Sequence, residues 1–172
     1  MIAPVIAMVL VFATDMVGKQ SLKGRMQVLA YSAVSVIKER VELYGETNAD
    51  AIDGKVLIDS NQATMVYNIV KDSMERTMIG FDDRKMGYAI EQYKVDGETN
   101  KVHHTTKLSD NNITCQPDKT LDKMKELHIK TSWNRPVSLY QVTFCYQDTN
   151  AFGDLIGGNY SMVKASAIML GR

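Results

Sequence analysis

An apolar run near the start of the sequence passes without a break into an amphipathic helical pattern. The run covers residues 2–13 and, past Asp15, reaches Val17. It falls just short of the ~20 apolar residues that a membrane-spanning helix usually needs, so a core helix and a signal sequence remain alternatives. A cleavable signal combines a basic segment before the apolar run with a small-residue cleavage site after it, and the sequence supplies both only weakly.

The residues that follow the run favour a helix that continues far beyond a bilayer. An apolar stripe recurs at spacings of three and four, formed by Ala30, Ala33, Val34, Ile37, Val41 and Tyr44. Gly45 then stops the pattern, which predicts one helix over residues 4–44, about 60 Å long. The sequence therefore predicts two parts: a membrane and spine helix over residues 1–44, and a globular head over residues 45–172.

The head is predicted to contain a second helix and several strands. Asp59 is a suitable N-cap with Gln62 three residues later, and the helix should end before Gly80. Its predicted inner face consists of Ala63, Val66, Ile69, Val70, Ser73 and Thr77. Alternating patterns predict strands over residues 86–93, 101–108, 139–146 and 160–169, with a hairpin turn at residues 96–100.

The connection between the two pairs of strands is predicted to be irregular. Residues 118–128 form a candidate short helix with Leu121, Met124 and His128 inward. Because the spine's apolar stripe and the strand faces need covering, the predicted fold class is α+β: a long N-terminal helix packed on an antiparallel sheet of about four strands, plus one or two shorter helices.

Charge and cysteine content limit the functions to consider. The chain has 20 Lys and Arg against 20 Asp and Glu, so it has no net charge that would attract nucleic acid. Cys115 and Cys145 are the only two cysteines. They form either a disulfide or two buried thiols, and a bridge closing that loop would stabilise the fold by about 3.7 kcal/mol in the chain-entropy model.

No motif predicts catalysis, a metal or a cofactor. His103 and His104 are neighbours on a predicted strand, so their side chains point to opposite faces and cannot share one ion. Residues 148–154 resemble the start of a calcium loop, but Phe152 occupies an oxygen-ligand position and Asn159 replaces the bidentate Glu. Nucleophile, phosphate-binding and zinc motifs are missing from the sequence, so no enzyme activity, cofactor or small-molecule substrate is expected.

Several stretches together resemble one family along almost the whole chain. Ala3-Pro4-Val5 opens the apolar helix, and Cys115-Gln116-Pro117 is a more distinctive match. Residues 139–145 and the terminal residues 166–172 resemble the family's C-terminal pattern. On these stretches the chain resembles the TadF-like minor pseudopilins of the tight adherence (Flp-type) pilus, which are related to type IV pilins.

This resemblance implies a structural role at the inner membrane of a Gram-negative bacterium. The head would lie in the periplasm, which suits a bridge from Cys115 to Cys145, and the partners would be other pilin and pseudopilin subunits and the inner-membrane assembly platform. The prepilin cleavage Gly of the family, and a Glu five places later, are expected upstream of Met1. Lys19, Lys23 and Arg25 follow the apolar run, and the positive-inside tendency alone would put that flank in the cytoplasm.

The leading hypothesis is a minor pilin-like subunit that acts by association of helices. Within lipid, small residues let helices approach closely, so Ala7, Ala13 and Gly18 are the predicted packing contacts. The alternative is a membrane-tethered periplasmic sensor or ligand-binding domain. That alternative requires a closed apolar cavity with a few polar groups, such as Tyr88, His103 or Tyr140.

Overall fold

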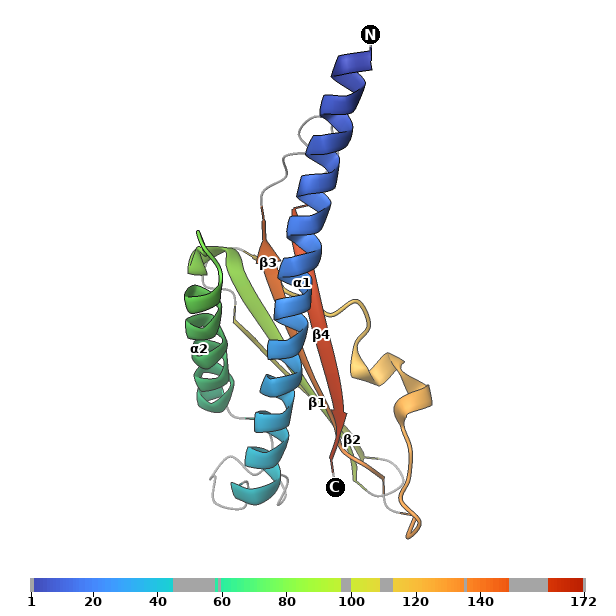
Figure 1. Cartoon of the computed structure of the whole chain (residues 1–172). Coiled ribbons are helices and arrows are strands. Elements are labelled where there is room, and N and C mark those ends of the chain that lie inside the picture. Colours follow the sequence, from blue (N-terminus) through green and yellow to red (C-terminus); the bar gives the residue numbers. More distant parts are fainter. Residues whose placement is uncertain are drawn as a thin grey trace.

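The structure, a computed structural model, describes residues 2–44, 58, 60–96, 100–108, 113–134, 136–148 and 161–171. Its longest element is the helix α1 (Ile2–Tyr44), which is continuous over 43 residues. The N-terminal part of α1 projects beyond the rest of the molecule, and its C-terminal part lies along the sheet (Figure 1). The single long helix predicted from the periodicity is confirmed.

The sheet is antiparallel throughout, with the strand order β2-β1-β3-β4. Its strands are β1 (Met86–Asp96), β2 (Asn100–Leu108), β3 (Leu139–Gln147) and β4 (Met162–Leu170). The described core side chains of the sheet come from three of them, β1, β3 and β4, while β2 pairs along the free edge of β1. The α+β fold class, with the long helix packed on an antiparallel sheet, is confirmed.

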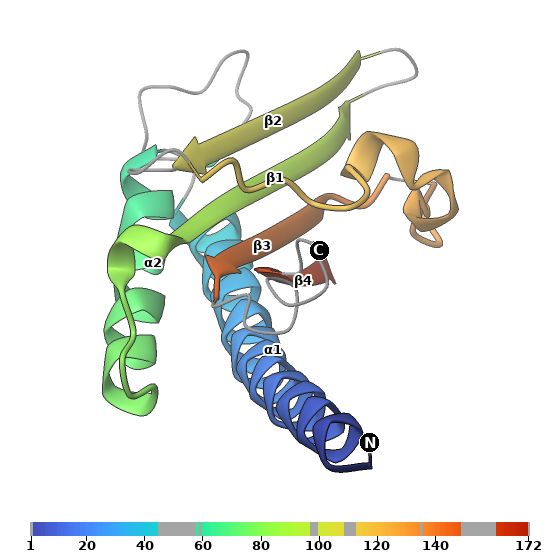
Figure 2. The same cartoon turned by 90° about the horizontal axis from the view of Figure 1, so that it is seen from above.

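Both long helices lie on one face of the sheet (Figure 2). Helix α1 packs over β4 and β3, and α2 (Ser60–Thr77) lies beside it. The predicted stripe from Ala30 to Val41 is buried in this interface, and the structure extends it towards the N-terminus through Leu22 and Met26. The main core combines this stripe with Tyr88, Ile90, Tyr140, Val142, Phe144, Val163, Ala165 and Ala167.

The predicted inner face of α2 needs a correction. Ile69 is 57% exposed and Thr77 is also exposed, whereas Tyr67 and Met74 are buried beside the predicted Ala63, Val66 and Val70. At about 100° per residue, Ile69 lies roughly a third of a turn from the centre of the buried stripe. Thr77 has the right direction but stands in the last turn of α2, where it is exposed.

The predicted short helix over residues 118–128 is also different in the structure. Two separate 3-10 turns replace it, η3 (Leu121–Lys123) and η4 (Lys125–Leu127). Leu121 is fully buried and Met124 and His128 are half-buried, so the inward residues were correctly identified although the helix type was not. A third 3-10 turn, η2 (Asp83–Lys85), leads into β1.

Candidate assembly surface

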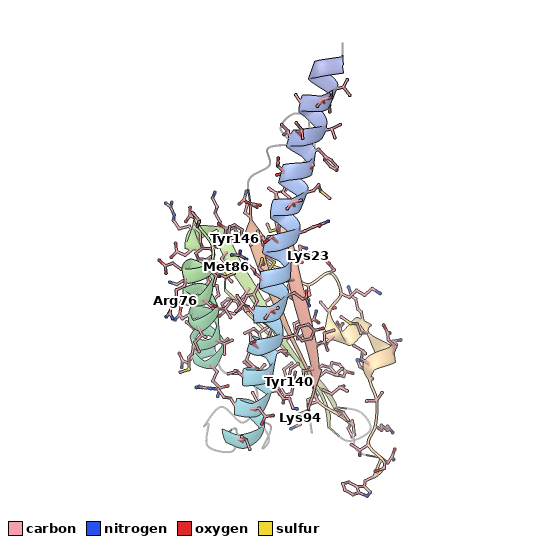
Figure 3. All side chains as sticks on the ribbon, in the orientation of Figure 1. Lys23, Arg76, Met86, Lys94, Tyr140 and Tyr146 are labelled. Carbon is pink, nitrogen blue, oxygen red and sulfur yellow. A yellow bond between two sulfur atoms is a disulfide. The ribbon has the colours of Figure 1, made fainter. Side chains whose placement is uncertain are left out.

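The first half of α1 presents a continuous apolar surface to its surroundings. Between Val5 and Val17 every large hydrophobic side chain is more than 40% exposed, namely Val5, Ile6, Met8, Val9, Leu10, Val11, Phe12, Met16 and Val17. By length and composition, α1 contains a segment apolar enough to cross a membrane, and only 6% of that segment is buried inside the protein. The side chains of this part stand away from the head (Figure 3).

Just after the exposed half, α1 has one internal ion pair and two polar contacts to the head. The Asp15 carboxylate and the Lys19 ammonium, one helical turn apart, pair at 2.6 Å and are nearly buried. The Arg25 guanidinium donates to the Thr77 carbonyl at the end of α2, and the Gln27 side-chain amide donates to the Ser166 carbonyl of β4 at 2.7 Å. These contacts were not predicted, although the i, i+4 spacing of Asp15 and Lys19 is a recognisable signal in the sequence.

The predicted packing contacts Ala7, Ala13 and Gly18 are all exposed. Ala7 and Gly18 are 11 residues apart, close to three full turns, so they share one face of α1, whereas Ala13 lies about a third of a turn away. A Cβ placed on Gly18 would meet no atom within 4 Å, so this position has room for a neighbouring helix. The role of these three residues in packing stays a prediction.

A disulfide joins Cys115 to Cys145, with the two Cα atoms 5.5 Å apart. Cys145 belongs to β3, so the bridge ties the connection that follows β2 to the face of the sheet opposite the helices. Gly87, the partner of Cys145 across β1 and β3, makes this approach possible: a Cβ there would lie 3.3 Å from the Cys115 Cβ. The structure thus contains the bridge that the resemblance implied.

Residues 113–128 cover this second face of the sheet. Glu91, Gln141 and Thr143, on the face away from the helices, are all at most 2% exposed. The Glu91 carboxylate accepts from the Leu121 backbone N–H at 3.0 Å, and the Gln141 amide donates to the Lys119 carbonyl at 3.3 Å. The sequence pattern gave no indication that these polar strand residues are buried.

A small apolar cluster completes this cover. Tyr93, Leu121 and Leu139 are buried together, with Leu127 and Ile168 packed against them. The His128 ring stacks on Tyr93 with 4.3 Å between the centroids, and its Nε2 lies 2.9 Å from the Leu121 carbonyl oxygen. These contacts give His128 a packing role.

Among the described residues, three of the four groups with shifted pKa values lie together. Asp82 and Arg84 stand at the turn before β1, and the Tyr146 hydroxyl accepts from the Asp82 backbone N–H at 3.2 Å. The hydrogen bond from the Arg84 side chain lowers the pKa of Asp82 and, in return, raises the pKa of Arg84. Burial raises the pKa of Tyr93, with a smaller contribution from the Asp122 charge, and burial also raises the pKa of Tyr146. Each shift has a local cause, a hydrogen bond for Asp82 and Arg84 and burial for the two tyrosines.

Among the described residues, no group of three His, Cys, Asp or Glu side chains could hold a metal ion. The backbones of His103 and His104 pair with Tyr93 and Gln92, which confirms that they are neighbours on one strand, but their side chains lie outside the description. The calcium-like turn at residues 148–154 also lies outside it beyond Asp148. The expectation that neither place binds a metal ion stays a prediction.

Two of the three residues named for a sensor pocket are packed into the core. Tyr88 is 1% exposed, with its ring centroid 4.9 Å from that of Tyr67. Tyr140 is 2% exposed and belongs to the same core cluster. The third residue, His103, has a side chain outside the described set. The two described tyrosines fill space between α1, α2 and the sheet.

The comparison with known protein families agrees with the exposed helix and the packed head. The model of the family TadF, described as "Putative tight adherence pilin protein F", matches residues 1–172. No curated protein and no solved structure matches the chain. The match extends over both halves of α1 and the whole head, and the chain therefore belongs to the TadF family of tight adherence pilin proteins.

Proposed function

We propose that the protein is a minor pilin-like subunit of a tight adherence pilus, anchored in the inner membrane by the first half of α1. It acts without catalysis, by packing this helix against those of other pilin and pseudopilin subunits and the assembly platform. The head lies in the periplasm, a compartment in which the Cys115–Cys145 disulfide persists. The observation that carries the proposal is a continuous helix whose first half is apolar and exposed and whose second half packs into the head.

The energetics support a role outside water for the first half of α1. Fully burying a Val, Leu, Ile, Phe or Met side chain contributes about 1.5–3 kcal/mol, and nine such side chains between Val5 and Val17 are partly to largely exposed. Removing these side chains from water should therefore contribute a favourable free energy on the order of 10 kcal/mol. Lipid and the helices of neighbouring subunits both provide that environment, which suits a subunit that moves from a membrane into a pilus.

Small residues determine which faces of the helix other helices can approach. Ala7 and Gly18 share a face, and Thr14 lies between them on the same side, so a neighbouring backbone can come close there. Ala13 offers a second, separate face. A pilus subunit surrounded by several others needs more than one such face.

The test is to fill these faces without disturbing the head. We expect the triple variant Ala7→Leu, Ala13→Leu, Gly18→Leu to lose most surface pili while remaining membrane-bound, because leucine fills the space but stays apolar and helix-favouring. Val5→Leu, which adds bulk on the side of α1 away from Ala7, is the matched control and should keep normal piliation. Pili are counted by electron microscopy, and disulfide formation reports the folding of the head. Normal piliation in the triple variant would contradict the proposal.

A further inference from the structure

We propose that a groove between α1 and the start of β4 binds the headgroup of an anionic phospholipid. The inference rests on the membrane anchoring proposed above. It concerns a specific site with a chemical preference, which anchoring by an apolar helix does not require.

The groove lies where α1 passes the first residues of β4 and encloses a volume of about 440 Å³. Its lining residues are Met16, Lys19, Gln20, Lys23, Asp118, Met162, Val163 and Lys164. Lys23, labelled in Figure 3, belongs to the part of α1 that passes the upper end of β4. The groove therefore combines three lysines with an apolar wall formed by two methionines and a valine.

The charges in the groove favour a single negative charge. Lys19 pairs with Asp15, and Lys164 pairs with Asp118 at 3.2 Å. Within the described part of the chain, the Lys23 ammonium has no hydrogen-bond or ion-pair partner. Three lysines against two carboxylates leave one net positive charge, which matches the one negative charge of a phosphodiester.

The depth of the groove matches the headgroup layer of a bilayer. The apolar run ends at Val17, and Lys19 and Lys23 lie about 3 Å and 9 Å further along the helix axis at 1.5 Å per residue. The headgroup layer on each side of a bilayer is roughly 5–8 Å thick, from the difference between the total thickness and the hydrocarbon core. Lys19 thus stands within the headgroup layer, and Lys23 stands at its outer edge, from which its long side chain reaches the phosphates.

An apolar stripe leads away from the groove towards the hydrocarbon. Val9, Phe12 and Met16 follow at helical spacing and are all more than 40% exposed, and the same face continues into Gln20 and Lys23. One face of α1 therefore changes from apolar to basic at Met16, in the same order as the acyl chains and phosphate of a lipid. A soluble phosphate would use only the basic part.

The test measures which lipid the full-length protein retains. The chain is reconstituted in nanodiscs of phosphatidylcholine and phosphatidylglycerol mixed equally, released into mild detergent, and examined by native mass spectrometry. We expect retained phosphatidylglycerol to exceed phosphatidylcholine at least 10-fold. The double variant Lys23→Gln, Lys164→Gln should reduce that ratio to near one, and the control Lys125→Gln, which changes an exposed lysine of η4, should leave it unchanged.

Two further arms separate the possible outcomes. Glycerol 3-phosphate at millimolar concentration should not displace the retained lipid, and displacement would overturn the lipid site in favour of a soluble phosphate ligand. A protein that enters nanodiscs of either lipid and retains both equally would overturn the lipid site but leave the proposed anchoring intact. A protein that enters no bilayer would overturn both.

Discussion

The apolar residues in the two halves of α1 have opposite surroundings, because those of the first half are exposed and those of the second half are buried on the sheet. Val9, in the first half, is 59% exposed, and Val34, in the second half, is fully buried against the sheet. The helix between them is continuous, and polar contacts to Thr77 and Ser166 hold it in place where the surroundings change. The second half packs on the protein's own head, whereas the large apolar side chains of the first half between Val5 and Val17 are exposed. Under the proposed function, lipid and other subunits cover them.

This difference assigns two roles to the two halves of α1: the second half contributes to the folding of the head, and the first half is proposed to contribute to assembly. The head buries its apolar surface without any contribution from residues before Leu22, so its stability should be insensitive to changes in the first half. Membrane insertion and piliation should depend on the first half even when the head is fully folded. One substitution made in each half gives the clearest contrast.

The largest expected effect is that of Val34→Asp. An unpaired carboxylate at a fully buried position should lower the free energy of unfolding by about 4 kcal/mol or more, enough to unfold many domains. The matched variant Val9→Asp should leave the head folded but weaken membrane insertion, because an Asp inside a spanning helix costs about 2.5–3.5 kcal/mol. Thermal unfolding by circular dichroism and fractionation of membranes measure the two effects. Equal loss of head stability in both variants would erase the distinction between the halves.

The next effect tests the head alone. Replacing Cys115 and Cys145 together by Ala should lower the free energy of unfolding by about 2–4 kcal/mol, because the bridge closes a 30-residue separation. Membrane association of this double variant should be unchanged. Denaturant unfolding in detergent, with and without reductant, measures the loss. If reductant destabilises the parent but not the variant, the loss belongs to the bridge itself.

A smaller effect is expected where the cover meets the second face of the sheet. Glu91→Ala removes the acceptor for the buried Leu121 N–H and should cost about 1–3 kcal/mol. Glu91→Gln keeps an acceptor oxygen and should cost less. Hydrogen exchange at the Leu121 amide reports the contact directly. Unchanged protection of that amide in Glu91→Ala would show that the cover is held by other contacts.

The smallest effect is a loss of head stability at high pH. Tyr93 and Tyr146 have pKa values raised above the ordinary 10.0, so the folded chain holds their protons more tightly than the unfolded chain does. Their contribution is fully present below pH 10.0 and is lost as the pH rises through the raised values. The melting temperature should therefore fall from pH 9 to pH 11, and less steeply in Tyr93→Phe. An identical slope in parent and variant would exclude Tyr93 as a cause.

Those parts of the fold that follow a regular period could be predicted from the sequence. The pattern predicts the stripe from Ala30 to Val41 and the positions of β1, β3 and β4, because a regular period reflects a buried face of a helix or strand. The same reasoning located the end of α1 at Tyr44 and the start of α2 at Ser60. The residues predicted to stop and cap these helices, Gly45 and Asp59, lie outside the described part of the chain.

The cover on the second face of the sheet could not be predicted in this way. Glu91, Gln141 and Thr143 alternate with apolar residues, a pattern that normally indicates a solvated face. They are buried because the irregular residues 113–128, tied down by a disulfide, cover this face, and backbone groups there bond to the Glu91 carboxylate and the Gln141 Nε2. The Thr143 hydroxyl bonds instead to that of Ser166 on β4. Contacts of this kind depend on tertiary structure and leave no period in the sequence. For the assembly surface, the sequence indicated the apolar run, but its exposure became visible only in the structure.

The most direct test of the account is photocrosslinking from the first half of α1 in piliated cells. A photoreactive phenylalanine derivative is placed at Val9, with a matched probe at Ile79, an exposed apolar residue of the head. The account predicts that the probe at Val9 crosslinks to other pilin or pseudopilin subunits and the probe at Ile79 gives far less of these products. Adducts to pilin subunits from Ile79 but none from Val9, in cells with normal pili, would contradict it.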